Sequence, residues 1–123
     1  MSKKILFIED EPALQETLTT MLKSGGYEVV SALDGEKGIE FAEKEKPDLI
    51  VLDLVLPKKD GFVILEHLKD NEETKNIDVI VLTNLEGAYD IERALNLGAM
   101  TYLVKTNHTP EDILKKINKK FET

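Results

Sequence analysis

The chain has 123 residues, a net charge of -8 and no cysteine, and 41% of its residues are hydrophobic. This hydrophobic share is too high for a disordered chain, and without cysteine there is no disulfide framework. The excess of acid argues against direct nucleic-acid binding through a broad basic face. No apolar run approaches the roughly 20 residues that span a bilayer, and the first residues do not form a signal peptide. We therefore expect a cytoplasmic protein with no membrane partner.

Apolar runs of strand length alternate with amphipathic stretches that have helical spacing. In chain order, the elements that we predict are a strand at 5–8, a helix around 14–22, a strand at 27–30, a helix around 39–42, a strand at 49–52, a helix around 63–68, a strand at 79–82, a helix around 91–97, a strand at 100–104 and a helix around 113–121. No linker or low-complexity segment divides them. We therefore expect one domain over residues 1–123, with no output domain in this chain.

Local signals mark where several of these helices begin and end. Gly25 and Gly26 follow the first helix as a stop signal, and Gly98 is placed to end the fourth. The last helix has the strongest start, because Thr109 can cap it and Pro110 suits its first position. An acidic residue three positions after the threonine completes a capping box. These signals support the alternation of strands and helices.

Strands that alternate with helices predict a parallel sheet with helices on both faces. The first, third and fourth runs are apolar throughout and belong at the centre, whereas Glu28 and Thr101 place the second and fifth runs at the edges. Right-handed crossovers then favour the strand order 2-1-3-4-5. We therefore expect a three-layer α/β/α fold with a doubly wound, five-stranded parallel sheet and five helices. In this order the chain reverses direction between the first and third strands, where a ligand crevice opens.

Polar residues follow the runs that should lie around this crevice. Glu9 and Asp10 come after the first run, and Asp53 comes after the third. Thr83 follows the fourth run and Lys105 follows the fifth. Because the carboxyl ends of parallel strands share one edge of the sheet, we expect these side chains to converge. Carboxylates that converge repel each other, so that one takes up a proton or together they bind a cation.

This set of groups suits phosphoryl transfer. Oxygen ligands favour a hard ion such as Mg²⁺, and a carboxylate can attack phosphorus to form an acyl phosphate. The charge on a transferring phosphoryl group needs a metal ion, a lysine and hydroxyl donors around it. We therefore assign Asp53 as the nucleophile and Glu9 with Asp10 as the metal site. Lys105 and Thr83 would clamp the phosphoryl group.

Simpler roles are open for single members of the set. Asp10 or Glu11 could cap a helix that begins at Pro12. Lys105 taken alone would be ordinary surface charge. Asp53 is the hardest to explain in this way, because an ionised carboxylate at the end of an apolar strand is costly unless something pairs with it. The expected convergence, rather than any single residue, supports the site.

Motifs at the strand ends are typical of one known family. They are Ile8-Glu9-Asp10-Glu11-Pro12, Asp53-Leu54-Val55-Leu56-Pro57-Lys58-Lys59-Asp60-Gly61, Leu82-Thr83, and Gly98-Ala99 followed by Tyr102-Leu103-Val104-Lys105. Each motif is weak alone, but all of them occur in order and at the expected strand ends. On these residues, and over nearly its full length, the chain resembles the receiver domain of two-component response regulators, which has a CheY-like, flavodoxin-like fold.

The resemblance implies a phosphorylation-activated signalling switch rather than an enzyme that turns over a substrate. Asp53 would accept a phosphoryl group from a histidine of a sensor histidine kinase or of a phosphotransfer protein. Mg²⁺ would be held by three carboxylates and one backbone carbonyl, those of Glu9, Asp10, Asp53 and Val55. Lys105 would contact the phosphoryl oxygens.

The resemblance also implies how the signal leaves the site. Thr83 would move toward the new phosphoryl group, and Tyr102 would follow it between outward and inward positions. The surface of the fourth helix, fifth strand and fifth helix would change and bind a protein target or a second copy of the chain. Phosphorylation adds roughly -1.5 to -2 units of charge, and it reshapes that surface only if the active conformer binds the group better.

Several positions depart from the family pattern. Asn84 stands where the residue is commonly small, and it could narrow the access to the nucleophile. Val55 and Leu85 are apolar and cannot orient an attacking water, so we expect a long-lived acyl phosphate. Thr106 stands where proline is usual. We expect a trans Lys105–Thr106 bond, because a cis bond before a residue other than proline costs about 3 kcal/mol.

Two other classes of protein stay open at this point. A phosphohydrolase with an aspartyl nucleophile needs a second acid two residues further on, and Val55 at this place weakens the case. A flavin or nucleotide module needs a glycine-rich phosphate loop, which the sequence lacks.

For kinase docking, the resemblance suggests the first helix near Ala13, Gln15 and Glu16.

Overall fold

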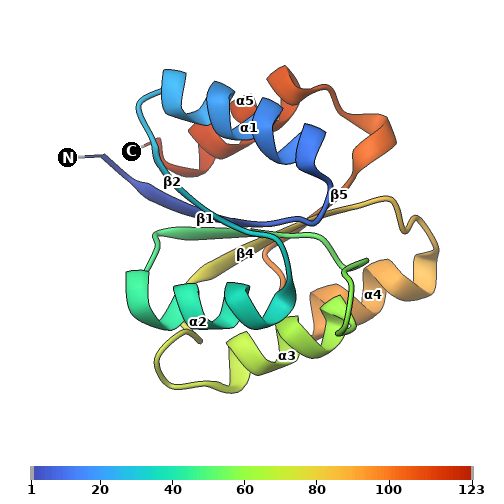
Figure 1. Ribbon diagram of the computed structural model, residues 1–123. Helices are drawn as coiled ribbons and strands as arrows, with labels where there is room; N and C mark the ends of the chain where they lie inside the picture. The colour runs from blue at the N-terminus through green and yellow to red at the C-terminus, as the bar shows by residue number, and fades with distance from the viewer. Residues whose placement is uncertain (1, 123) are drawn as a thin grey trace.

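A computed structural model describes residues 2–122 as an alternation of strands and helices. In chain order the elements are β1 (Lys4–Ile8), α1 (Pro12–Ser24), β2 (Glu28–Ala32), α2 (Gly35–Glu45), β3 (Leu49–Leu52), α3 (Gly61–Asp70), β4 (Asp78–Thr83), α4 (Ala88–Asn96), β5 (Thr101–Val104), the short 3-10 helix η1 (Lys105–Asn107) and α5 (Pro110–Lys120). None of the helices in this range is long and apolar enough to cross a membrane. Figure 1 shows one sheet between two layers of helices.

The strands form one parallel sheet in the order β2-β1-β3-β4-β5, as the sequence predicts. Strand β3 is buried along its whole length, and β1 and β4 are buried after their first residue. The edge strands β2 and β5 keep half-buried or exposed residues. Inner strands are covered by helices on both faces, and for that reason their apolar runs predict their place.

Side chains of β1 alternate between two hydrophobic cores. Ile5 and Phe7 pack on the face that is covered by α1 and α5, and Leu6 and Ile8 pack on the face that is covered by α2, α3 and α4 (Figure 1). This alternation follows from the two-residue period of a strand. The two cores bury the side chains of the sheet and leave its carboxyl edge for polar residues.

Local capping explains where α5 begins. The Thr109 hydroxyl accepts a hydrogen bond from the Asp112 N–H at 3.1 Å, and the Thr109 N–H donates to the Asp112 carboxylate at 3.0 Å. This is the predicted capping box, with Pro110 in the first turn. Gly26 and Gly98 follow α1 and α4 with φ values of 96° and 111°, in the left-handed region that favours glycine.

Some boundaries and faces differ from the sequence prediction. Strand β2 spans Glu28–Ala32 rather than 27–30, because its pairing with β1 continues to the last residue of both strands. Strand β5 begins at Thr101, one residue later than expected. Val63 and Leu95, apolar residues of the helical patterns expected around 63–68 and 91–97, are 51% and 45% exposed. Single apolar side chains on a surface are common, so apolar character alone does not fix the buried face of a short helix.

Candidate functional site

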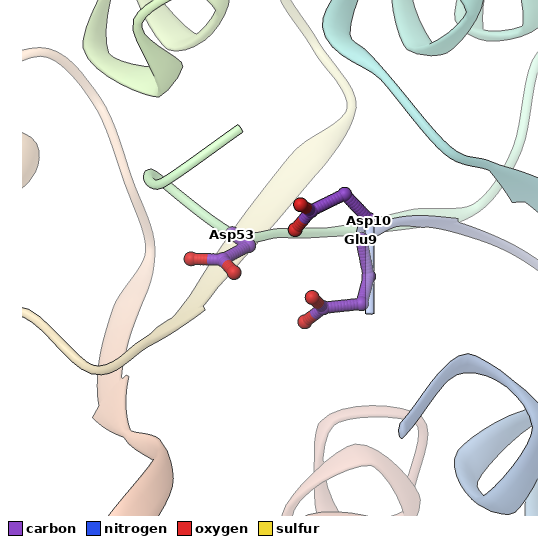
Figure 2. A group of neighbouring side chains, drawn as sticks. All are labelled: Glu9, Asp10 and Asp53. Carbon is purple, nitrogen blue, oxygen red and sulfur yellow. The ribbon is translucent and has the colours of Figure 1, made fainter. Parts of the chain in front are cut away.

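Glu9 and Asp53 lie at the same edge of the sheet because their strands are neighbours in register. Ile8 of β1 is paired with Leu52 of β3, so the next residue of each strand leaves the sheet at the same level. The Asp53 N–H donates to the Ile8 carbonyl at 3.0 Å and continues the pairing. Asp10 follows in the loop before α1, and Figure 2 shows the three acidic side chains gathered at this edge.

These three carboxylates, of Glu9, Asp10 and Asp53, form an acidic cluster. One oxygen from each lies within 4.8 Å of the others. Glu9 and Asp53 are buried, with 0% and 3% of their surface exposed, whereas Asp10 is exposed. All the donor atoms are oxygens, and such a set suits a hard cation such as Mg²⁺. The acidic cluster therefore fits a metal ion, with Asp10 as its exposed member.

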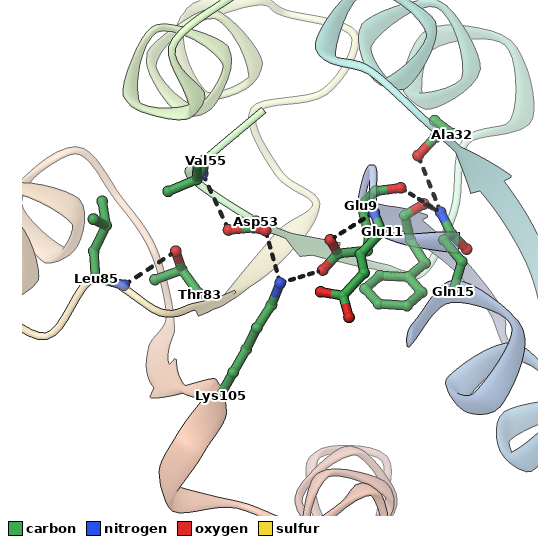
Figure 3. Close-up of polar contacts among 10 residues, drawn as sticks. Glu9, Glu11, Gln15, Ala32, Asp53, Val55, Thr83, Leu85 and Lys105 are labelled. Carbon is green, nitrogen blue, oxygen red and sulfur yellow. Dashed lines mark hydrogen bonds and ion pairs between the residues drawn. The ribbon is translucent and has the colours of Figure 1, made fainter. Parts of the chain in front are cut away.

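Lys105 brings a positive charge to the acidic cluster from two strands away. It follows β5 and begins η1. Its Nζ lies 2.7 Å from Glu9 Oε1 and 2.8 Å from Asp53 Oδ2 (Figure 3). Burial lowers the pKa of Lys105, but the contacts with the two carboxylates raise it by more, so the ammonium stays charged. Within residues 2–122 every peptide bond is trans, including the Lys105–Thr106 bond, as predicted.

Burial raises the pKa of the Glu9 carboxyl to about 6. The charge of Asp53 acts in the same direction, whereas Lys105 and the Glu11 N–H, which donates to Glu9 Oε2 at 3.1 Å, oppose it. Among the described residues, Glu9 Oε1 has no well-aligned hydrogen-bond donor, so its short contact with Lys105 is an ion pair. Both oxygens of the buried Glu9 carboxylate therefore face positive or donor groups, Oε1 the Lys105 ammonium and Oε2 the Glu11 N–H.

Two hydroxyl groups contact Leu85, in the segment between β4 and α4. Thr83 ends β4 and is fully buried, and its Oγ1 lies 3.5 Å from the backbone nitrogen of Leu85, at the limit of a hydrogen bond. The Tyr102 hydroxyl donates to the Leu85 carbonyl at 2.6 Å. Burial raises the pKa of Tyr102, and the charges of Asp90 and Asp53 add to this effect, so the phenol remains a neutral donor.

Val55 contributes its backbone and an exposed side chain at the rim of the site. Its N–H donates to Asp53 Oδ1 at 3.0 Å and orients that carboxylate. A hollow of about 190 Å³ opens over the acidic cluster. It is lined by Glu9, Asp10, Glu11, Asp53, Val55, Asn84 and Lys105. The exposed Asn84 thus lies beside the acidic cluster.

Gln15 lies elsewhere than the sequence reasoning placed it. We expected Gln15 on the surface of α1 for docking a kinase, but it is only 6% exposed and donates to backbone carbonyls behind the acidic cluster. Its side chain is therefore not part of the exposed face of α1, on which Ala13 and Glu16 lie. Its spacing could have indicated this, because Gln15, Leu18 and Leu22 share the buried stripe of α1.

Comparisons with known proteins agree with this geometry. The model of the response regulator receiver domain family matches residues 5–118. The DNA-binding dual master transcriptional regulator RpaA of Synechocystis sp. is 42% identical to this chain over 102 residues, which are 83% of this chain and 42% of RpaA. The chain therefore spans less than half the length of this relative.

Solved structures have the same fold. A CheY-like response regulator receiver domain protein from Methanospirillum hungatei has a TM-score of 0.90 at 29% identity, over 98% of this chain and 94% of that one. The BeF3-activated receiver domain of Klebsiella pneumoniae RstA has a TM-score of 0.85 at 30% identity, over 94% and 96%. The family match over most of the chain, together with the acidic edge of a 2-1-3-4-5 sheet, confirms the resemblance inferred from the motifs. This chain belongs to the response regulator receiver domain family, the phosphorylation-activated signalling domains of two-component systems.

Proposed function

We propose that Asp53 accepts a phosphoryl group in a Mg²⁺-dependent reaction and that this modification switches the domain. The observation that supports this best is the position of Asp53, buried just after β3, with the Lys105 ammonium 2.8 Å from its Oδ2 and the other two carboxylates of the acidic cluster beside it. A buried carboxylate with a positive partner and a cation site beside it suits attack on an electrophile. The donor is a phosphohistidine of a sensor histidine kinase or of a phosphotransfer protein.

In the proposed step a carboxylate oxygen of Asp53 forms a bond to phosphorus, and the P–N bond of the phosphohistidine breaks. The electrons of that bond leave with the imidazole, which takes up a proton from solvent, and Asp53 becomes an acyl phosphate. The Val55 N–H orients the attacking carboxylate. The Lys105 ammonium, 2.8 Å from Asp53 Oδ2, is close enough to transfer its contact to the phosphoryl oxygens.

The acidic cluster fits the metal ion that this step needs. The carboxylates of Glu9, Asp10 and Asp53, with the backbone carbonyl of Val55, would hold Mg²⁺. When bound, the ion neutralises negative charge on the phosphoryl group. Glu9 serves this role best when it is ionised, and a cation beside it opposes the burial that raises its pKa.

Thr83 and Tyr102 are the proposed links between the site and a partner. Both contact Leu85, in the segment that leads into α4. A Thr83 hydroxyl that turns toward a phosphoryl oxygen gives up its weak contact with the Leu85 N–H, and a shift of Leu85 would also alter its hydrogen bond with Tyr102. The surface formed by α4, β5 and α5 would change with it and bind a protein target or a second copy of the chain.

The proposed output partner of this domain is a protein rather than nucleic acid. A net charge of -8 does not suit direct contact with a phosphate backbone. RpaA is named as a DNA-binding regulator, but this chain matches only 42% of its length, so we do not transfer that activity to this domain. The single-domain organisation and the cytoplasmic location expected from the sequence remain predictions.

A phosphohydrolase with an aspartyl nucleophile is the second candidate function. Such an enzyme protonates its leaving group with an acid two residues after the nucleophile, and this position is Val55, with an apolar side chain. We therefore infer that the domain catalyses only its own phosphorylation and a slow loss of the phosphoryl group. Sustained hydrolysis of a phosphomonoester would support the enzyme instead.

The test is to incubate the chain with acetyl phosphate, with and without Mg²⁺, and to measure its mass. We expect a Mg²⁺-dependent gain of one phosphoryl group that is absent in Asp53→Asn. Asp70→Asn is the matched control, because Asp70 is an exposed aspartate at the end of α3. A label that persists in Asp53→Asn, or that forms equally without Mg²⁺, would contradict the proposal.

A further inference from the structure

A buried glutamine supports the acidic cluster from behind. Gln15 of α1 is 6% exposed, and its Nε2 lies 3.1 Å from each of three backbone carbonyl oxygens. These carbonyls belong to Phe7 of β1, to Glu9 in the loop after β1 and to Ala32 at the end of β2. Figure 3 shows Gln15 beside Glu9 and Ala32. We propose that Gln15 is a positioning residue that fixes the loop carrying Glu9 and Asp10 and so sets the affinity of the acidic cluster for Mg²⁺.

The contact with Glu9 reaches the acidic cluster through one peptide group. Gln15 holds the carbonyl of the planar peptide between Glu9 and Asp10, so a rotation of this plane would turn both side chains. Among residues 2–122 this carbonyl has no other hydrogen-bond partner. The Ala32 carbonyl, which also accepts from Gln15, accepts the Glu9 N–H at 3.0 Å. The peptide groups on both sides of Glu9 are therefore held around the same amide.

Electrostatics fixes which end of the Gln15 amide faces the carbonyls. The amide nitrogen can donate, whereas the amide oxygen would be repelled by three carbonyl oxygens. The nitrogen has only two hydrogens for these three acceptors, and Gln15 Oε1 is buried without a partner in the described part of the chain. An unpaired buried oxygen lowers the stability of the fold. An apolar side chain at this position on the buried stripe of α1 would avoid this cost. The hydrogen bonds to the loop therefore explain the presence of a glutamine at this position better than hydrophobic packing does.

This inference depends on the proposed function only through the binding of Mg²⁺. Groups that orient metal ligands commonly change the affinity for the metal by about 10- to 100-fold. Gln15 acts through the backbone, so we expect an effect at the lower end of that range. Because its side chain touches neither the ion nor the phosphoryl group in the proposed arrangement, Mg²⁺ affinity should change more than the rate at saturating Mg²⁺.

A calorimetric titration with Mg²⁺ alone tests the proposal. We expect Gln15→Met, which keeps the length of the side chain but has no donor, to weaken Mg²⁺ binding about tenfold. Thr74→Val is the matched control, because Thr74 is 1% exposed and its hydroxyl donates to the Leu68 carbonyl at 2.6 Å. Thr74 lies before the first residue of β4, whereas the acidic cluster lies at the carboxyl ends of the strands. Loss of the Thr74 hydroxyl should therefore leave the Mg²⁺ affinity unchanged.

The outcomes of this titration separate the two proposals. Equal Mg²⁺ affinity in Gln15→Met and in the unaltered chain would overturn the positioning role and leave the metal site intact. A similar loss of affinity in Thr74→Val would also overturn it, because general destabilisation would then explain the effect. An unaltered chain that binds no Mg²⁺ would overturn both the positioning role and the proposed metal site.

Phosphorylation kinetics distinguish positioning from a general structural effect. With acetyl phosphate, Gln15→Met should raise the Mg²⁺ concentration for half-maximal rate about tenfold, with the rate at saturating Mg²⁺ within about twofold of the unaltered chain. A lower saturated rate at an unchanged half-maximal concentration would contradict the proposal.

A measurement on the unaltered chain keeps the inference testable if Gln15→Met does not fold. Gln15 is the only glutamine in the sequence, so its side-chain amide gives one assignable pair of NMR signals. We expect these protons to exchange with solvent about tenfold more slowly than those of the exposed Asn84, and to shift when Mg²⁺ is added. Fast exchange with no response to Mg²⁺ would overturn the positioning role.

Discussion

Glu9 is the residue at which the requirements of the site oppose those of the fold. Burial and the charge of Asp53 raise its pKa from 4.5 to about 6, so the folded chain binds a proton at Glu9 more tightly than the unfolded chain does. The resulting stabilisation is complete below about pH 4.5 and is lost as the pH rises through 6. In a buffer with a chelator we expect this residue alone to lower the free energy of unfolding by about 2 kcal/mol between these limits.

Urea denaturation of the unaltered chain and of Glu9→Gln at several pH values checks this prediction. Glutamine does not titrate, so the difference between the two stability curves isolates Glu9 from the other carboxylates. The difference should change by about 2 kcal/mol as the pH rises from below 4.5 to above 6. Two parallel curves would contradict the raised pKa of Glu9.

We predict that the apolar rim of the site makes the proposed acyl phosphate long-lived. Val55 lines the hollow with a side chain that is 54% exposed and cannot hydrogen-bond an attacking water. We expect an unassisted half-life of minutes or longer, and we expect Val55→Asn to shorten it about tenfold, since one hydrogen bond of about 1.4 kcal/mol in the transition state has that effect. Val63→Asn, at a valine on α3 with a similar 51% exposure, should leave the half-life unchanged. A half-life of seconds in the unaltered chain would count against the prediction.

At the scale of single elements, α5 shows how far local sequence fixes a helix. Its capping box satisfies the Thr109 and Asp112 N–H groups, and the Thr109 N–H holds the pKa of the Asp112 carboxyl below its usual value. We expect Thr109→Ala to lower the free energy of unfolding by about 1 kcal/mol, with Thr109→Ser within a few tenths of the unaltered chain. Urea denaturation at neutral pH measures both variants. Equal stability of Thr109→Ala and the unaltered chain would mean that the cap does not stabilise α5.

The start of α1 is an element that local signals predict less well. The sequence left open whether Asp10 or Glu11 caps the helix. Glu11 occupies the cap position, but its side chain makes no capping bond, and its N–H is satisfied by the Glu9 carboxylate. Asp10 is therefore not needed for capping and is available to a metal ion. The conformation of the loop between β1 and α1 determines which residue takes the cap position. The pattern of residue types does not predict this conformation.

At the scale of the whole molecule, the order of the strands in the sheet could be predicted because a strand buried on both faces has an apolar sequence. Runs that are apolar throughout lie at the centre, and this order brings Glu9 and Asp53 to neighbouring strand ends. Contacts between distant loops could not be predicted in this way. The hydrogen bond from Tyr102 to Leu85 and the burial of Gln15 depend on side-chain direction and on packing between elements. Periodicity describes one element at a time, so it does not contain these contacts.

With a net charge of -8, the chain should be stabilised by any salt, and this general effect has to be separated from the effect of Mg²⁺ bound at one site. Any salt screens the repulsion among these charges, but Mg²⁺ bound to the acidic cluster adds stability by mass action. At a concentration ten times the dissociation constant the gain is about 1.4 kcal/mol, or a rise in Tm of about 5 °C for a domain of this size. We expect a clearly smaller rise in Tm in NaCl of equal ionic strength. In Asp10→Asn, which keeps the buried part of the acidic cluster, we expect the two salts to raise Tm equally. Equal shifts in the unaltered chain would assign its response to Mg²⁺ to overall charge rather than to the acidic cluster.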